Sequence, residues 1–238
     1  MKLSIIIPVL NEGNSISKIL DYLLEIQNPE FTNEIIVVDG GSKDGTLEIL
    51  QSYPEIKILF SEKGRAKQMN FGAKNANSEI LYFLHCDTFP PKNFDSKIVN
   101  KVQNGNLSGC FKMKFDNNHI ILEVSEWFTR FNFQAFRGGD QSLFVEKQLF
   151  EKLNGFDENL IIYEDNELIA RLYKNSKFTV IQKTVTTSAR KYLKNGIWKL
   201  QFHFLMIHIK YCLGSSQENL VRYYVKNIMW NCYKNLNH

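Results

Sequence analysis

Short apolar runs alternate with helical patterns over the first ninety residues, and this alternation constrains the fold more than any other feature. Two runs, 3–9 and 34–38, are short, continuous and rich in β-branched residues, as buried parallel strands are, and two further strands are expected at 56–60 and 80–84. Between them, apolar residues recur at the helical period in segments 16–24, 45–53 and 65–77. Strands and helices at this spacing predict a parallel sheet with helices on both faces.

The rest of the chain is more varied. Residues 110–115 alternate apolar and charged side chains, which predicts a half-exposed strand. We further expect strands at 142–145 and 178–181, and helices at 120–131, 164–173, 196–213 and 217–235. The prediction is therefore an α/β domain with a mostly parallel sheet, residues 1–192, followed by a helical C-terminal extension, residues 193–238.

Composition narrows the class of protein. The 29 Lys and Arg residues exceed the 25 Asp and Glu residues by four, and they are spread along the chain. Because no basic arm is present, we expect no nucleic-acid partner. The cysteines form no CxxC pair, which favours reduced thiols in a cytoplasmic protein: Cys86, Cys110, Cys212 and Cys232. The first residues lack the features of a secretory signal, and no uncharged stretch reaches about 18 residues.

Polar and charged residues follow each of the first four predicted strands. They are the segments 11–13, 39–46, 61–65 and 85–88. In an open parallel sheet, ligands bind at the carboxyl ends of the strands. The sequence therefore predicts a polar small-molecule site at this edge.

These segments carry a resemblance to a known family. The motifs that carry it are Pro8-Val9-Leu10-Asn11-Glu12, residues 36–46, Gly64 to Asn70, Gly139-Asp140-Gln141, Gly155-Phe156-Asp157 and Glu164-Asp165. Within 36–46, Gly40 stands where the family usually has a second Asp. In this order they resemble the family 2 glycosyltransferases of the GT-A fold, whose sheet is Rossmann-like. The closest likeness is to the transferase 2 branch associated with radical-SAM and selenium-related domains, and it covers residues 3 to about 192.

The resemblance implies a nucleotide-diphosphate sugar as the donor, most readily a UDP-sugar. It implies that Glu12 and Asp39 hold the nucleobase and ribose, with Pro8 and Leu10 beside them. The alternative for this loop is that Ser42 and Asp44 cap the next helix.

A diphosphate suits the segment Lys63-Gly64-Arg65, because backbone N–H groups at a helix start favour anions. Arg190, in Ser188-Ala189-Arg190, is predicted to close over that diphosphate. For each of these cations the alternative is an ordinary solvated side chain.

Asp87 is the predicted metal ligand. The GT-A fold usually has Asp-x-Asp here, and its last carboxylate binds Mg²⁺ or Mn²⁺ between the phosphates. This chain has His85-Cys86-Asp87, so His85 replaces the first acid and is expected to contact the ribose or to support Asp87. A Cys/His nucleophile is excluded, since neighbouring strand residues point to opposite faces.

The resemblance implies that Asp165, beside Glu164, removes the proton of the acceptor hydroxyl and that the anomeric carbon is inverted. The alternative is that both are simply acids of a first helical turn. Asp140 and Gln141 are predicted on the acceptor side, with a plain loop as the alternative.

The helix at 198–213 is apolar on most sides, and three explanations stay open: core packing, a homo-oligomer interface, and contact with a membrane surface. Our prediction of function is a metal-dependent inverting glycosyltransferase with an unidentified acceptor. A sugar-phosphate nucleotidyltransferase is one alternative, although such enzymes usually carry a Gly-rich basic loop after strand one. A non-catalytic nucleotide-sugar-binding module of the same fold is the other.

Overall fold

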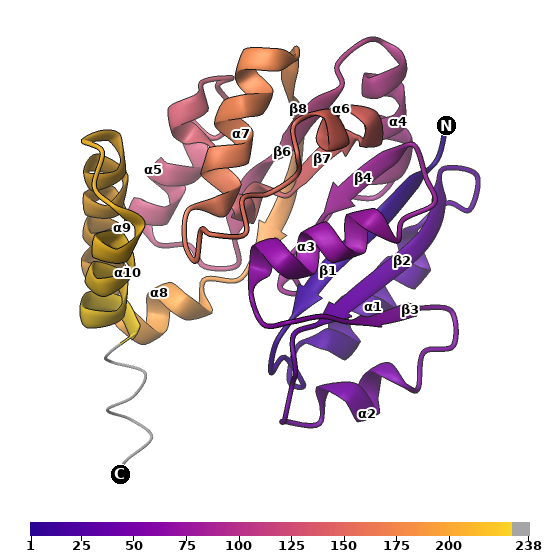
Figure 1. Ribbon diagram of the computed structural model, residues 1–238, viewed down its shortest axis with the longest axis horizontal. Coiled ribbons are helices and arrows are strands. Elements are labelled where there is room, and N and C mark those ends of the chain that lie inside the picture. Colours follow the sequence, from indigo (N-terminus) through magenta and orange to yellow (C-terminus); the bar gives the residue numbers. More distant parts are fainter. Residues whose placement is uncertain (230–238) are drawn as a thin grey trace.

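The computed structural model describes residues 1–229 and contains one mixed sheet with helices on both faces (Figure 1). The strand order is β3-β2-β1-β4-β7-β6-β8-β5. The strands are β1 (Leu3–Val9), β2 (Thr32–Asp39), β3 (Lys57–Phe60), β4 (Ile80–Phe83), β5 (Thr88–Phe89), β6 (Ser108–Phe115), β7 (Leu143–Glu146) and β8 (Phe178–Thr187).

The helices of the sheet region are α1 (Ile16–Ile26), α2 (Thr46–Leu50), α3 (Arg65–Lys74), α4 (Phe94–Gln103), α5 (Ile120–Phe128), α6 (Lys147–Lys152) and α7 (Glu164–Asn175). Two short 3₁₀ turns, η1 (Gln134–Phe136) and η2 (Gly139–Gln141), precede β7. The C-terminal helices are α8 (Arg190–Asn195), α9 (Ile197–Cys212), α10 (Gln217–Tyr224) and a π-helical turn, η3 (Val225–Met229).

The predicted parallel sheet is present in the first part of the chain, where β1 pairs in parallel with β2 and β4, and β2 with β3. All of β1 is buried, and its side chains alternate between two cores. Ile5 and Ile7 join the core under α1, whereas Ile6 joins the core under α3. Helix α3 approaches β1 closely, since a Cβ on Gly72 would lie 2.5 Å from Ile6.

The second part of the sheet is mixed, because β7 lies antiparallel between β4 and β6. Strand β8 is parallel to β6 and antiparallel to β5. The alternation predicted for 110–115 holds: Phe111, Met113 and Phe115 are buried, and Lys114 is exposed. The sequence patterns missed α4, α6, α8 and β5, and they ended β8 six residues early, at 181 instead of 187.

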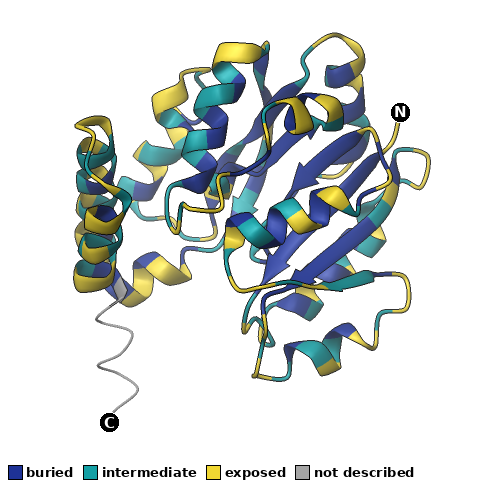
Figure 2. Ribbon diagram, in the orientation of Figure 1, coloured by how far each residue is buried: buried dark blue, intermediate teal, exposed yellow. Residues whose placement is uncertain are grey.

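Helices α9 and α10 stand at one side of the molecule, next to α5 (Figure 1). Leu200, Ile207 and Leu220 connect them to the core that also contains α1. Their outward positions are mostly exposed (Figure 2). The predicted helix at 217–235 is present as far as the description reaches; its last six residues, with Cys232, lie outside the described residues. The division at residue 192 stays a prediction.

Candidate active site

The loops after β1 and β2 form one hydrogen-bonded unit. The Asn11 amide N–H donates to Ser42 Oγ over 2.9 Å, and the Lys43 N–H donates to Asn11 Oδ1 over 2.8 Å. Asp44 accepts from Gly13 and from the N–H of Thr46, the first residue of α2, as the capping alternative expects, whereas Ser42 contacts Asn11 and Asp39 instead. These bonds hold Glu12 at the edge of the sheet.

Asp39 ends β2 and is only 1% exposed. Its carboxylate accepts from the backbone N–H groups of Gly41 and Ser42, at 2.8 and 3.0 Å, and from the Ser42 hydroxyl. The left-handed φ of +94° at Gly41 turns the chain back over this carboxylate. In this structure Asp39 therefore organises its own loop; its contact with a nucleobase stays a prediction.

Gln68 is a buried polar residue whose importance the sequence did not reveal. Its Nε2 donates to the carbonyls of Val9 and Val38, at 2.7 and 2.8 Å, and so ties the ends of β1 and β2 together. A Cβ on Gly40 would lie 3.0 Å from the Gln68 side chain, which leaves little room for the acid that the family usually has there. The available signal was a Gln on the same helix face as Met69, Gly72 and Ala73.

Arg65 forms ion pairs with the two candidate catalytic acids, and its expected contact with a diphosphate stays a prediction. Its Nη2 is 3.0 Å from Asp165 Oδ2, and its Nε is 3.2 Å from Glu164 Oε1. The neighbouring Lys63 is exposed, and Gly64 precedes α3 with a φ of +143°. The first residue of α3 thus reaches α7, because both helices cover the same face of the sheet.

The His85 ring contacts Arg65, and its expected contact with the ribose or support of Asp87 stays a prediction. Arg65 Nη2 donates to His85 Nε2 over 2.7 Å. Burial, and then the charge of Arg65, hold the pKa of His85 well below its usual value. The imidazole is therefore neutral and accepts this bond.

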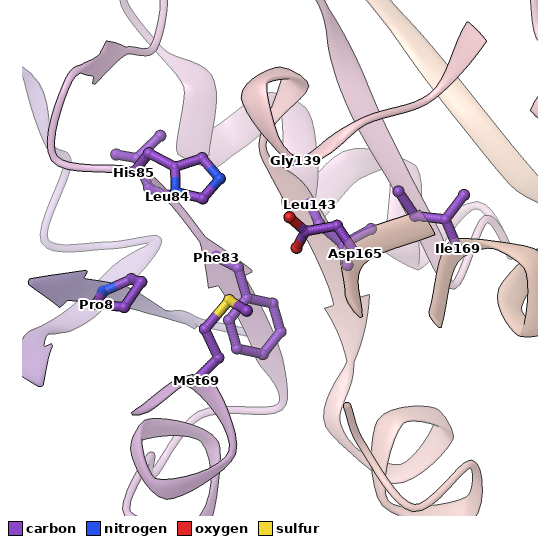
Figure 3. Close-up of a pocket in the computed structure, with 9 residues that line it drawn as sticks. All are labelled: Pro8, Met69, Phe83, Leu84, His85, Gly139, Leu143, Asp165 and Ile169. Atoms are coloured by element: carbon purple, nitrogen blue, oxygen red, sulfur yellow. The ribbon is translucent and has the colours of Figure 1, made fainter. Parts of the chain in front are cut away.

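Glu164 and Asp165 open α7, as predicted, and both are buried. Burial raises the pKa of Asp165 to about 7; Arg65 opposes this rise, whereas Glu164 and Asp140 add to it. A Cβ on Gly139 would lie 2.1 Å from Asp165 Oδ2, so only glycine fits where this loop crosses the carboxylate. In Figure 3 the His85 ring and the Asp165 carboxylate face each other across a small pocket, which Pro8 also lines.

Arg190 forms a second cluster at the same edge. Its guanidinium makes a two-pronged ion pair with Glu12, at 2.9 and 3.0 Å, and lies 3.2 Å from Asp87 Oδ2. Burial raises the pKa of Asp87, and Arg190 partly offsets that rise. The structure thus brings a predicted nucleotide ligand, the predicted metal ligand and the predicted diphosphate ligand into direct contact.

The two residues predicted on the acceptor side differ from each other. Asp140 is exposed, and its charge raises the pKa of both Asp87 and Asp165, so it lies near both clusters. Gln141 is buried in a network with Arg137 and Cys110, and its Nε2 donates to Phe136. Both polar atoms of its side chain have partners inside the protein, and its place on the acceptor side stays a prediction.

The chemistry of the acids allows one type of divalent-metal site. Within residues 1–229, no group of three or more His, Cys, Asp or Glu side chains is arranged to hold a metal. Mg²⁺, however, is commonly bound by one or two carboxylates together with substrate phosphates. Asp87 alone therefore fits an ion that is shared with a diphosphate.

Helices α9 and α10 contact residues 161–163, the segment directly before Glu164 and Asp165, which we call the catalytic loop. Tyr163 precedes Glu164 with a φ of +73°, an uncommon backbone conformation for this residue type. Its hydroxyl is hydrogen-bonded to His208 of α9, and its ring lies 4.3 Å from that of Tyr211. Gln217 of α10 donates to the Ile162 carbonyl over 2.9 Å. The sequence did not point to Tyr163, because its partners are at least 45 residues away.

Comparison with known proteins now identifies the family. The sequence profile described as Glycosyl transferase family 2 matches residues 4–148, more than half of the chain. The chain belongs to this family. A Methanococcus voltae relative, a dolichyl N-acetyl-α-D-glucosaminyl phosphate 3-β-D-2,3-diacetamido-2,3-dideoxy-β-D-glucuronosyltransferase, is 32% identical over 96% of this chain and 76% of its own. Glycosyltransferase AglE of Haloferax volcanii is 27% identical over 66% of this chain.

Solved structures support a GT-A fold for this family 2 chain. TarS of S. aureus in complex with UDP has a TM-score of 0.67 at 22% identity, covering 79% of this chain and 60% of TarS. The mannosyltransferase PcManGT of Pyrobaculum calidifontis, in complex with GDP-Man and Mn²⁺, has a TM-score of 0.66 at 18% identity, covering 87% and 62%. The chain spans about half the length of the first curated relatives: the match covers 57% of AglE and 46% of a second relative.

Proposed function

We propose that this family 2 chain is an inverting glycosyltransferase that moves a sugar from a nucleotide-diphosphate donor, most readily UDP-linked, to an acceptor hydroxyl. The observation that carries the proposal is the Asp165 carboxylate, buried at the start of α7 with a pKa of about 7. A base with this pKa is half ionised near neutral pH and accepts a proton efficiently there. Neighbours of the same fold were solved with UDP, UDP-GlcNAc and GDP-Man.

In the proposed reaction, the acceptor oxygen attacks the anomeric carbon while the bond from that carbon to the diphosphate breaks. Asp165 takes the hydroxyl proton, and Arg65 keeps the carboxylate oriented through its 3.0 Å contact. Glu164 holds the other side of Arg65. Asp140, exposed near both carboxylate clusters, faces the acceptor. Because the attacking and leaving groups are opposite each other, the configuration inverts.

The donor would bind at the carboxyl ends of β1, β2 and β4. Glu12, with Pro8, Leu10 and Asp39 beside it, would hold the nucleoside, and Lys63 and the Gly64 N–H would face the phosphates. Arg190 would exchange its contacts with Glu12 and Asp87 for the diphosphate. Asp87 would hold Mg²⁺ or Mn²⁺, which supplies positive charge to the leaving diphosphate when bound. We place this reaction in the cytoplasm.

Calorimetry tests the donor class. Titration of the chain with UDP and GDP in the presence of Mn²⁺ is expected to give binding by one of them, and Asp87→Asn is expected to remove the Mn²⁺-dependent part. The matched control is Asp157→Asn, an exposed acid in the segment between α6 and α7. No binding by any nucleoside diphosphate would contradict the proposal. Binding of nucleotide sugars without transfer to any acceptor would favour a non-catalytic module.

A further inference from the structure

Helix α9 has two apolar faces, of which only one is packed. Leu200 and Ile207 point into the protein core. On the other side lies a stripe that we call the docking face, whose side chains are between 39% and 80% exposed: Trp198, Phe202, Leu205, Ile209 and Leu213. These residues recur every three or four positions, so they share one side of the helix. Figure 2 shows the outward positions of this helix as exposed.

The charged side chains of the segment that carries the docking face have one sign, whereas the neighbouring helices α5 and α10 also carry Glu123, Glu126 and Glu218. Residues 190–213 include five Lys and Arg residues and no Asp or Glu. At about 100° per residue, Lys199 and Lys210 both lie next to the docking face on the same flank of α9. An apolar stripe bordered by lysines is the pattern of a helix that lies in the surface of an anionic membrane.

A neighbouring helix extends the exposed apolar surface. Helix α5 packs beside α9 (Figure 1) and buries Leu122. Its other side is exposed at Ile120, Val124, Trp127 and Phe128. Aromatic residues such as Trp127 and Trp198 are favoured at the boundary between lipid headgroups and acyl chains. This part of the molecule therefore has two apolar helix faces, on α9 and α5, whose side chains are largely exposed to solvent.

We propose that the docking face of α9 binds the surface of a bilayer that contains anionic phospholipid, with the helix parallel to the surface. An antiparallel second copy of the chain is disfavoured as the partner, because that pairing of two docking faces would bring the lysine flanks of both copies, with Lys199 and Lys210, to the same side. Among the described helices, none is long and apolar enough to cross a bilayer. Contact along the surface is the arrangement that buries the stripe and keeps both lysines at the headgroups.

Docking would bring the catalytic loop close to the membrane. The side of α9 opposite to the docking face contacts Tyr163, which directly precedes Glu164 and Asp165. A helix with its side chains is about 10–12 Å across. The active site would therefore open within reach of an acceptor held at the membrane surface. The inference goes beyond the proposed function, since membrane binding needs no turnover.

Vesicle sedimentation tests the proposal with the full chain. We expect it to bind phosphatidylcholine vesicles that contain about 30% phosphatidylglycerol, and to bind pure phosphatidylcholine at least about fivefold more weakly. Phe202→Gln with Ile209→Gln is expected to weaken binding to the anionic vesicles at least about tenfold. Lys199→Glu is expected to weaken it at least about fivefold.

The control is Phe60→Gln, which changes a side chain of similar exposure, 64% against 56% for Phe202, on the distant edge strand β3. We expect Phe60→Gln to bind like the wild type. Thermal unfolding checks that all variants are folded. We expect them to fold because the substituted side chains are exposed. No binding of the wild type to anionic vesicles would overturn the proposal, as would equal binding by the Phe202/Ile209 variant. A wild-type dimer that this variant makes monomeric would assign the face to a second copy instead.

Discussion

Two arginines at the same edge of the sheet each form ion pairs with two carboxylates, but the structural elements that carry the two groups differ. Arg65 binds Glu164 and Asp165, whose side chains are 4% and 13% exposed. Arg190 binds Glu12 and Asp87, whose side chains are 20% and 26% exposed. The chemistry is the same, but the second cluster is open to water.

The elements around the clusters explain this difference. Helix α3 packs on β1 and β2, and α7 is anchored by Leu168, Ile169 and Leu172, so both sides of the Arg65 cluster are fixed. Arg190 begins the six-residue helix α8, which leads directly into α9. A buried carboxylate depends on its fixed cation, whereas an open ion pair contributes only about 0–1 kcal/mol and exchanges readily. We infer that the first cluster tunes a base and that the second receives a ligand.

The largest effect is expected from Asp165→Asn, which removes the proposed base and keeps the shape of the side chain. Transfer should fall by about 10²–10⁴-fold, the usual contribution of general base catalysis. Donor affinity measured by calorimetry should change little, since Asp165 lies in the Arg65 cluster. Loss of donor binding together with transfer would contradict the assignment of base catalysis to the Arg65 cluster and of donor binding to the Arg190 cluster.

Two substitutions around Asp165 should move the pH profile in opposite directions. Asp165 must be ionised to accept a proton, so kcat should rise with pH through about 7 in the wild type. Arg65→Gln removes the cation that lowers this pKa, and the rise should move to higher pH. Glu164→Gln removes an anion that raises it, and the rise should move to lower pH. A shift of one unit changes the ionised fraction well below the pKa about tenfold.

The measurement is kcat between pH 5 and 9, with unfolding monitored at each pH. Shifts of both variants in the same direction would show that the substitutions act through general destabilisation and not through the charge on Asp165.

Arg190→Gln should affect binding more than stability. Loss of a charge-assisted contact with the diphosphate should weaken donor binding about tenfold. The free energy of unfolding should change by less than about 1 kcal/mol, because the ion pairs are partly exposed. Arg222→Gln breaks the exposed pair with Glu218 and serves as the control. Tighter donor binding by Arg190→Gln would mean that Arg190 blocks the site.

The smallest effect is expected from Tyr163→Phe, which removes the hydroxyl bonded to His208. A hydrogen bond of this kind contributes about 0.5–1.5 kcal/mol, so kcat should fall about two- to tenfold while donor affinity stays unchanged. Tyr173→Phe, which loses a bond to Asn132, is the matched control. An unchanged kcat would show that the contact with α9 does not help to orient the catalytic acids.

The first half of the fold could be predicted because its signals are local. A strand such as β1 is apolar along its whole length, and the helix after it repeats Ile16, Ile19, Leu20 and Leu23 on one face. Short elements such as α6 and α8 carry too few residues to show a period. The antiparallel position of β7 depends on which strand edge remains free, and no local pattern records this.

The positions of the candidate site residues on helices and loops could be predicted from the sequence, but their contacts with one another could not. Glu164 and Asp165 were expected at a helix start and lie there, whereas the contacts of Arg65 with Asp165 and His85 were not indicated by the sequence. Gln68 and Tyr163 act through contacts with distant backbone and side-chain groups, which residue type alone does not indicate.

The sequence by itself determined the parallel strands, the polar loops at their carboxyl ends and the acids that open α7, since each depends on neighbours within a few residues. Only the tertiary structure decided which charged side chains form ion pairs with one another. Arg65 reaches Asp165 across 100 positions of sequence, and Arg190 reaches Glu12 across 178. The pKa of a carboxylate depends on its burial and on charges within a few ångströms, and both exist only once the chain has folded.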